Sequence, residues 1–161
     1  MMINKYIFLV SVISFAILSR FLPHPPNFTP VTAIALLSSK GFNNRWIGLL
    51  IPMIILFISD LVLGLHGSIP FVYGAFILIS LFGSFVEKIN IGVVLSSSVI
   101  FFLVSNFGVW FLYYPSTFTD LVTCYTLAIP FFLNTILGDL FFSALMIYSF
   151  YYMQKRQIIS A

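Results

Sequence analysis

A carboxylate, Asp60, stands inside a long apolar run of the sequence. A charged side chain at the centre of a membrane-spanning helix costs roughly 2.5–3.5 kcal/mol, so it faces a cavity or a charged partner. Two interpretations are open. Asp60 binds a ligand or couples an ion, or it has a structural role, either pairing with Arg20 or capping the turn at residues 64–67. The two roles can coexist.

Other polar side chains are expected at a similar depth. The amides of Asn27, Asn106 and Asn134 suit a polar ligand that is uncharged or zwitterionic, although asparagines also connect helices inside membranes. The ring of Trp110 suits stacking on a flat ligand. Together the candidate binding residues are Asp60, Asn106, Trp110, Asn134, Asn27, His24, Tyr73, Arg20 and His66.

Metal chemistry is an alternative for part of this set. His24, His66 and Asp60 are side chains that suit zinc, nickel or cobalt. Their spacing matches no metal-binding motif, and a histidine at a membrane interface commonly bonds to a loop carbonyl. We therefore expect neither a metal nor a cofactor.

Hydrolysis by paired aspartates is a second alternative. Asp60 and Asp139 could share a proton and activate water. However, residue 136 is Ile where a Gly-x-Gly-Asp site has Gly, and the two aspartates are expected at different depths. Asp139 could equally form hydrogen bonds to a serine of the 96–98 run. We expect that the chain is not an enzyme.

The composition indicates the environment in which these residues lie. Of the 161 residues, 61% are hydrophobic and only 7% are charged, whereas soluble domains carry about 25% charged residues. This excludes a water-soluble domain, a disordered chain and a nucleic-acid binder. The lone cysteine, Cys124, excludes an internal disulfide. The chain is predicted to be one integral membrane domain, 1–161, in contact with the lipid bilayer.

The apolar runs predict an all-α protein, a bundle of six transmembrane helices. A positive start followed by an apolar run also fits a signal peptide, but Arg20 follows the run directly and no small-x-small cleavage site is present. The second helix is too short to cross a core of roughly 30 Å alone, and the proline-rich segment 21–30 before it must be extended. The predicted helices cover residues 3–20, 29–39, 46–63, 69–86, 91–114 and 126–152.

The charges predict the orientation. With six crossings, Arg20 is the one basic residue on one side, and the other side holds Lys5, Lys40, Arg45, Lys88, Lys155 and Arg156. Basic residues accumulate in cytoplasmic loops. We therefore expect both termini in the cytoplasm, a multi-pass protein of the inner (cytoplasmic) membrane, and a polar pocket that opens to the outside.

Three strings of the sequence resemble a bacterial family without an established activity, whose members are described as transport proteins. These strings are SRFLPHPPNFTPVTAIAL, ISDLVLGLHG and SNFGVWFLYYPSTFTDLVTCYTLAIPFFLNTILGDL, and the resemblance covers about residues 19–148. The architecture is also similar to the substrate-binding S component of energy-coupling factor transporters. That resemblance implies six helices, a vitamin or metal ligand bound on the outer side, and an ATP-driven energy-coupling module as partner.

One feature of those S components is not matched. Many of them dock through alanines spaced four residues apart in the first helix, whereas Val12 and Arg20 stand four residues from Ala16. The leading hypothesis is a substrate-binding membrane protein for uptake of a small polar nutrient, captured on the extracytoplasmic side. The alternatives are a membrane assembly or anchoring protein that transports nothing, and a small proton-coupled secondary transporter.

Overall fold

The computed structural model describes residues 5–41, 45–115 and 117–155, and within these residues the chain is helical with no strand. Its helices are α1 (Lys5–Ser19), α2 (Val31–Gly41), α3 (Arg45–Leu63), α4 (Ile69–Phe85), α5 (Ile91–Tyr113) and α6 (Phe118–Lys155). The all-α prediction is therefore confirmed. Residues 3–4 of the first predicted helix lie outside the described part of the chain.

Three of these helices are long and apolar enough to cross a membrane. They cover Trp46–Leu63, Ile91–Tyr113 and Phe118–Met153. The other apolar helices are shorter, at Val10–Ser19, Val31–Lys40 and Ile69–Phe85. Large apolar side chains are exposed along the outer faces of the long helices, for example Leu61, Phe111 and Leu137. Such surfaces are costly in water and suit a lipid environment.

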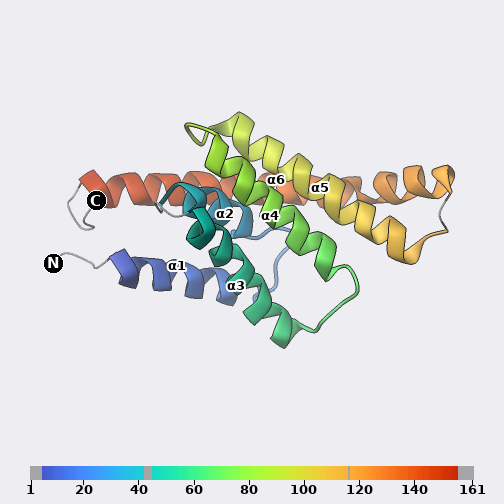
Figure 1. Ribbon diagram of the computed structural model, residues 1–161, viewed down its shortest axis with the longest axis horizontal. Helices are drawn as coiled ribbons and strands as arrows, with labels where there is room; N and C mark the ends of the chain where they lie inside the picture. Colours follow the sequence, from blue (N-terminus) through green and yellow to red (C-terminus); the bar gives the residue numbers. More distant parts are fainter. Residues whose placement is uncertain (1–4, 42–44, 116, 156–161) are drawn as a thin grey trace.

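The short helix α2 lies at the centre of the bundle and contacts α3, α4, α5 and α6 (Figure 1). Each residue from Val31 to Leu36 is nearly or completely buried. Glycines allow the neighbouring helices to approach closely. A Cβ atom at Gly48 of α3 would lie 2.5 Å from the carbonyl oxygen of Ser38, and one at Gly83 of α4 would lie 2.5 Å from Oγ of Ser39. A side chain at Gly48 would clash with the α2 backbone, and one at Gly83 would displace the Ser39 side chain.

The last helix begins earlier than the sequence predicted. Helix α6 starts at Phe118 rather than near residue 126, so the polar stretch before residue 126 is mostly helix and not loop. The reason is a local cap. The Thr117 hydroxyl oxygen accepts a hydrogen bond from the backbone N–H of Asp120 at 3.2 Å, and the Thr117 hydroxyl donates to the Asp120 carboxylate. This reciprocal pairing satisfies polar groups of the first turn.

The helices are arranged with alternating direction. The start of α1, the end of α6 and the α4–α5 connection lie towards one end of the bundle, on the left in Figure 1. The α3–α4 and α5–α6 connections lie towards the opposite end. The segment between α1 and α2 crosses the middle of the bundle and brings residues 20–30 against α3 and α6 (Figure 1).

Candidate functional site

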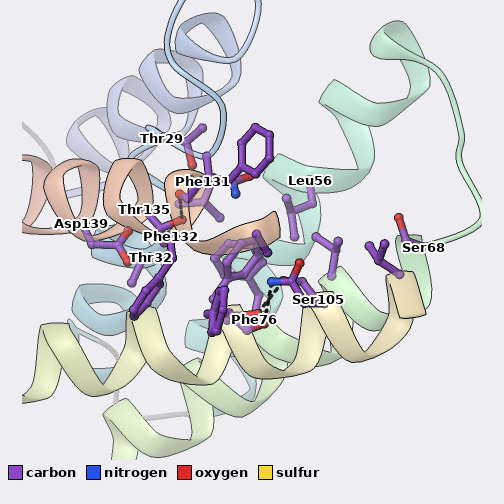
Figure 2. Close-up of a pocket in the computed structure, with 18 of the residues that line it drawn as sticks. Thr29, Thr32, Leu56, Ser68, Phe76, Ser105, Phe131, Phe132, Thr135 and Asp139 are labelled. Carbon is purple, nitrogen blue, oxygen red and sulfur yellow. Dashed lines mark hydrogen bonds between the residues drawn. The ribbon is translucent and has the colours of Figure 1, made fainter. Parts of the chain in front are cut away.

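A cavity of about 390 Å³ lies between the linker 20–30 and helices α2 to α6 (Figure 2). Its wall is apolar where Phe and Leu side chains meet and polar where short side chains and loop residues point inward. The polar and charged lining residues are Arg20, His24, Asn27, Thr29, Thr32, His66, Ser68, Ser105, Asn106, Thr135 and Asp139. A volume of this size is within the range of pockets for small molecules.

The linker is held over the cavity by Phe28. Its ring contacts Phe142 and Phe141 of α6, with centroid distances of 5.4 Å and 5.9 Å. Its Cα lies so close to α6 that a Cβ atom at Gly138 would be 2.9 Å away. The preceding residue, Asn27, has a φ angle of 66°, a left-handed conformation that asparagine tolerates better than most residues. This turn places Asn27 and Thr29 in the cavity wall.

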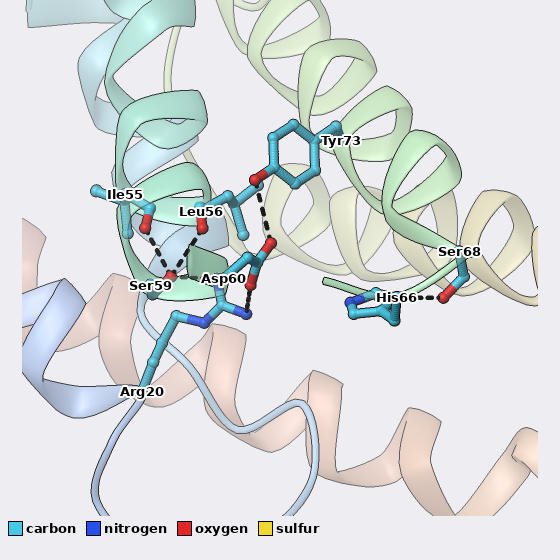
Figure 3. A network of polar contacts seen from close by, with 8 residues as sticks. All are labelled: Arg20, Ile55, Leu56, Ser59, Asp60, His66, Ser68 and Tyr73. Carbon is cyan, nitrogen blue, oxygen red and sulfur yellow. Dashed lines mark hydrogen bonds and ion pairs between the residues drawn. The ribbon is translucent and has the colours of Figure 1, made fainter. Parts of the chain in front are cut away.

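An ion pair ties the start of the same linker to α3 (Figure 3). The Arg20 guanidinium lies 2.8 Å from the Asp60 carboxylate and donates a second hydrogen bond, of 2.6 Å, to Oγ of Ser59. The Tyr73 hydroxyl of α4 donates to the other Asp60 oxygen at 3.1 Å. The side chain of Asp60 is 3% exposed and does not line the cavity, whereas Arg20 does. The structural pairing considered for Asp60 is therefore present.

Asp139 lies at the other end of the cavity, on α6. It accepts a hydrogen bond of 2.6 Å from Ser98 of α5 and also interacts with the side chain of Thr32 at the start of α2. Figure 2 shows Asp139 beside Thr32 and Thr135. The interaction with a serine of the 96–98 run was one of the two possibilities considered for Asp139. Among the described contacts, Asp60 and Asp139 have no hydrogen-bond partner in common.

The cavity wall contains part of the predicted set. Arg20, His24, Asn27, His66 and Asn106 line it. The Asn106 amide also donates to the carbonyl of Phe102, one turn earlier in α5, at 2.8 Å. The two histidines bond locally, His24 to the carbonyl of Pro25 and His66 to the Ser68 hydroxyl.

The remaining candidates do not line the cavity. Asp60 and Tyr73 belong to the ion-pair cluster. Trp110 packs against Phe107 with ring centroids 5.5 Å apart, and its buried Nε1 has no hydrogen-bond partner in the described part of the chain. Asn134 is half-buried on α6. As ligand-binding residues, all nine candidates remain predictions.

Sequence reasoning missed the lining residues Phe131, Thr135, Thr29 and Thr32, and it considered Asp139 but not among the binding candidates. Phe131, Thr135 and Asp139 follow one another at spacings of four in α6, so they share one face of the helix. That polar and aromatic stripe was a usable signal. Thr29 in the linker and Thr32 in the first turn of α2 gave no such signal, because short hydroxyl side chains commonly bond to nearby backbone groups.

The residues considered for a metal do not form a cluster. Among the side chains that the structure describes, no group of three or more His, Cys, Asp or Glu is close enough to hold a metal ion. Cys124 is buried, and its thiol lies 3.6 Å from the carbonyl oxygen of Asn106.

Comparison with known proteins places this fold in a family. A family profile matches residues 2–160, almost the whole chain. The chain belongs to the family of unknown function DUF6580. Neither the curated proteins nor the solved structures contain a significant match to this DUF6580 chain. The resemblance to S components and to transport proteins stays a prediction.

Proposed function

We propose that this DUF6580 protein is a multi-pass membrane protein that captures a small polar molecule from the extracytoplasmic side and serves its uptake. The observation that carries this proposal is the cavity of about 390 Å³ with polar walls inside a bundle of apolar helices. Polar groups within apolar helices are costly unless they face a partner, a cavity or a ligand. Hydroxyls, amides, imidazoles and a carboxylate all meet at this cavity.

The charges at the helix ends support a proposed membrane orientation. Lys40 and Lys155 lie in the last turns of α2 and α6, and Lys88 lies in the α4–α5 connection. The α4–α5 connection and the end of α6 lie at the same end of the bundle as the start of α1 (Figure 1). Basic residues near helix ends favour the cytoplasmic side. We propose six crossings in the inner membrane with both termini in the cytoplasm. In this arrangement the short helix α2 is held inside the membrane by the helices packed around it. The linker 20–30 and its cavity then face outward.

Uptake requires an energy source that these residues do not supply. The sequence holds no phosphate-binding loop of the Gly-x-x-x-x-Gly-Lys-Ser/Thr type. An ATP-driven energy-coupling module is therefore the proposed partner, as the resemblance to S components implies. If vesicles without ATP still took up the compound, and an uncoupler abolished this uptake, the proton-coupled secondary transporter would be favoured instead.

The capture step can be tested with two asparagines. Asn106 lines the cavity and Asn134 does not, although both are half-buried amides on long apolar helices. We would purify the protein in nanodiscs and identify by denaturing mass spectrometry any small molecule that accompanies it, with metals measured in parallel. We expect a compound near one per protein that is lost in Asn106→Leu and retained in Asn134→Leu.

Two results would overturn the capture proposal. One is a folded wild-type protein that carries no compound and is not stabilised by any fraction of a metabolite extract. The other is a compound lost equally from both asparagine variants, since the cavity would then not be its site. Either result would favour the anchoring protein, in which the polar residues only connect helices.

A further inference from the structure

The charges that line the cavity do not balance. Only Arg20 and Asp139 carry a formal charge among the lining residues when the histidines are neutral. Arg20 is already neutralised, because its guanidinium lies 2.8 Å from the Asp60 carboxylate. His24 and His66 lie in the linkers and bond to neighbours there. The uncompensated charge in the wall is the Asp139 carboxylate.

Asp139 has polar partners but no cation. Its residue is 1% exposed, and Ser98 and Thr32 approach its carboxylate with neutral hydroxyl groups. In the described part of the chain, the salt bridge is that of Arg20 with Asp60, and none involves Asp139. Hydroxyl donors satisfy lone pairs, but they do not offset the cost of burying a negative charge. A cation that entered the cavity would offset it.

The aromatic rings of the cavity wall favour the same kind of occupant. Five phenylalanines line the cavity, at Phe76, Phe101, Phe102, Phe131 and Phe132. Four of them form two pairs, with centroid distances of 4.5 Å for Phe102 with Phe132 and 5.2 Å for Phe76 with Phe101. The faces of aromatic rings attract cations and also stack on flat ligands. An anionic ligand would meet Asp139 and find no free basic partner.

We propose that the cavity selects a small organic cation, an aromatic or heteroaromatic ring that carries a positively charged nitrogen, with Asp139 as its counter-ion. This inference rests on the proposed capture function and names its ligand class. The nitrogen lies against the Asp139 carboxylate between α2, α5 and α6. The ring lies among the phenylalanines that line the cavity.

Three probes of one shape test the charge preference. Benzylammonium, benzyl alcohol and benzoate share a ring but differ in charge, and the binding of each can be measured by equilibrium dialysis against nanodisc-embedded protein. Empty nanodiscs correct for partition into lipid. We expect benzylammonium to bind about tenfold or more tightly than benzyl alcohol, because a hydrogen bond to a charged group typically changes affinity by that much. Benzoate should bind most weakly.

Two aspartates of α6, Asp139 and Asp120, provide matched variants. Asp139→Asn keeps an acceptor for Ser98 and removes the charge, so the preference for benzylammonium should disappear. Asp120→Asn changes a carboxylate in the first turn of α6 that does not line the cavity, and it should leave the preference intact in folded protein. The wild-type ranking is decisive even where a variant does not fold.

The outcomes separate this inference from the capture function. If the wild-type protein binds all three probes equally, or prefers the alcohol or benzoate, the cation inference fails while capture by the cavity stands. If the preference survives in Asp139→Asn, Asp139 is not the counter-ion and the inference also fails. If no probe binds and no compound accompanies the purified protein, both proposals fail.

Discussion

The ion pair between Arg20 and Asp60 offers the most direct test of how the linker is held over the cavity. Its Nη2–Oδ1 distance is 2.8 Å, and the two side chains are 17% and 3% exposed. Removing one member of a buried pair typically costs 3–5 kcal/mol, because the other charge stays buried without a partner. Replacing both members by apolar side chains costs much less.

The magnitudes follow from what each single variant leaves behind. Arg20→Met leaves Asp60 with the Tyr73 hydroxyl at 3.1 Å as its remaining donor, so we expect a loss of about 3 kcal/mol in unfolding free energy. Asp60→Leu leaves Arg20, which is partly exposed and still donates to Ser59 at 2.6 Å, so we expect about 2 kcal/mol. The double variant should lose no more than about 2 kcal/mol, which is a coupling of roughly 3 kcal/mol.

Reversible unfolding in mixed micelles with increasing dodecyl sulfate measures all four proteins on one scale. Asp120→Asn, an aspartate in the first turn of α6 outside the ion-pair cluster, is the control for loss of a carboxylate. Additive losses in the double variant would refute the reasoning. So would single variants within about 0.5 kcal/mol of the wild type, the ordinary range of surface substitutions.

Three further predictions concern packing, capping and topology. Gly48→Ala should destabilise the protein by about 1–3 kcal/mol, because its Cβ would lie 2.5 Å from the α2 backbone. Gly74→Ala should be harmless, since nothing lies within 4 Å of a Cβ there. Thermal unfolding compares the two variants, and equal effects would contradict the packing described for α2. Thr117→Ala should remove about 0.5–2 kcal/mol and speed hydrogen exchange in the first turn of α6, while exchange elsewhere stays constant. With the native cysteine replaced by alanine, Leu65→Cys should react with an impermeant maleimide in intact cells and Glu87→Cys only after permeabilisation; the reverse would invert the proposed orientation.

Most helix positions could be predicted from the sequence because apolar runs and their breaks are strong signals. The break at residues 64–68 gave the end of α3 and the start of α4 as the structure has them. The start of α6 was missed for a physical reason. Thr117 and Asp120 belong to residue types that favour both turns and helix caps, so their polarity alone does not distinguish a loop from the beginning of a helix.

The site was harder to predict than the fold. Helix α5 carries apolar side chains on every side, so its hydrophobic pattern does not indicate which face meets the cavity and which meets lipid. Asn106 faces the cavity, whereas Trp110 at the next turn packs beside Phe107 and does not line it. Phe28 packs against Gly138, which lies 110 residues later in the sequence. No local sequence pattern indicates such a distant contact.

The position of α2 also constrains how the protein is made. With 11 residues it is about 16 Å long, roughly half of a bilayer core, and residues 31–36 meet other helices rather than lipid. Such a segment gains too little from lipid contact to enter the membrane by itself. We expect α2 to stay near the membrane surface during synthesis and to insert only when α3 to α6 can pack around it. Until α6 has left the ribosome, the chain would then be an unassembled intermediate that proteases can reach.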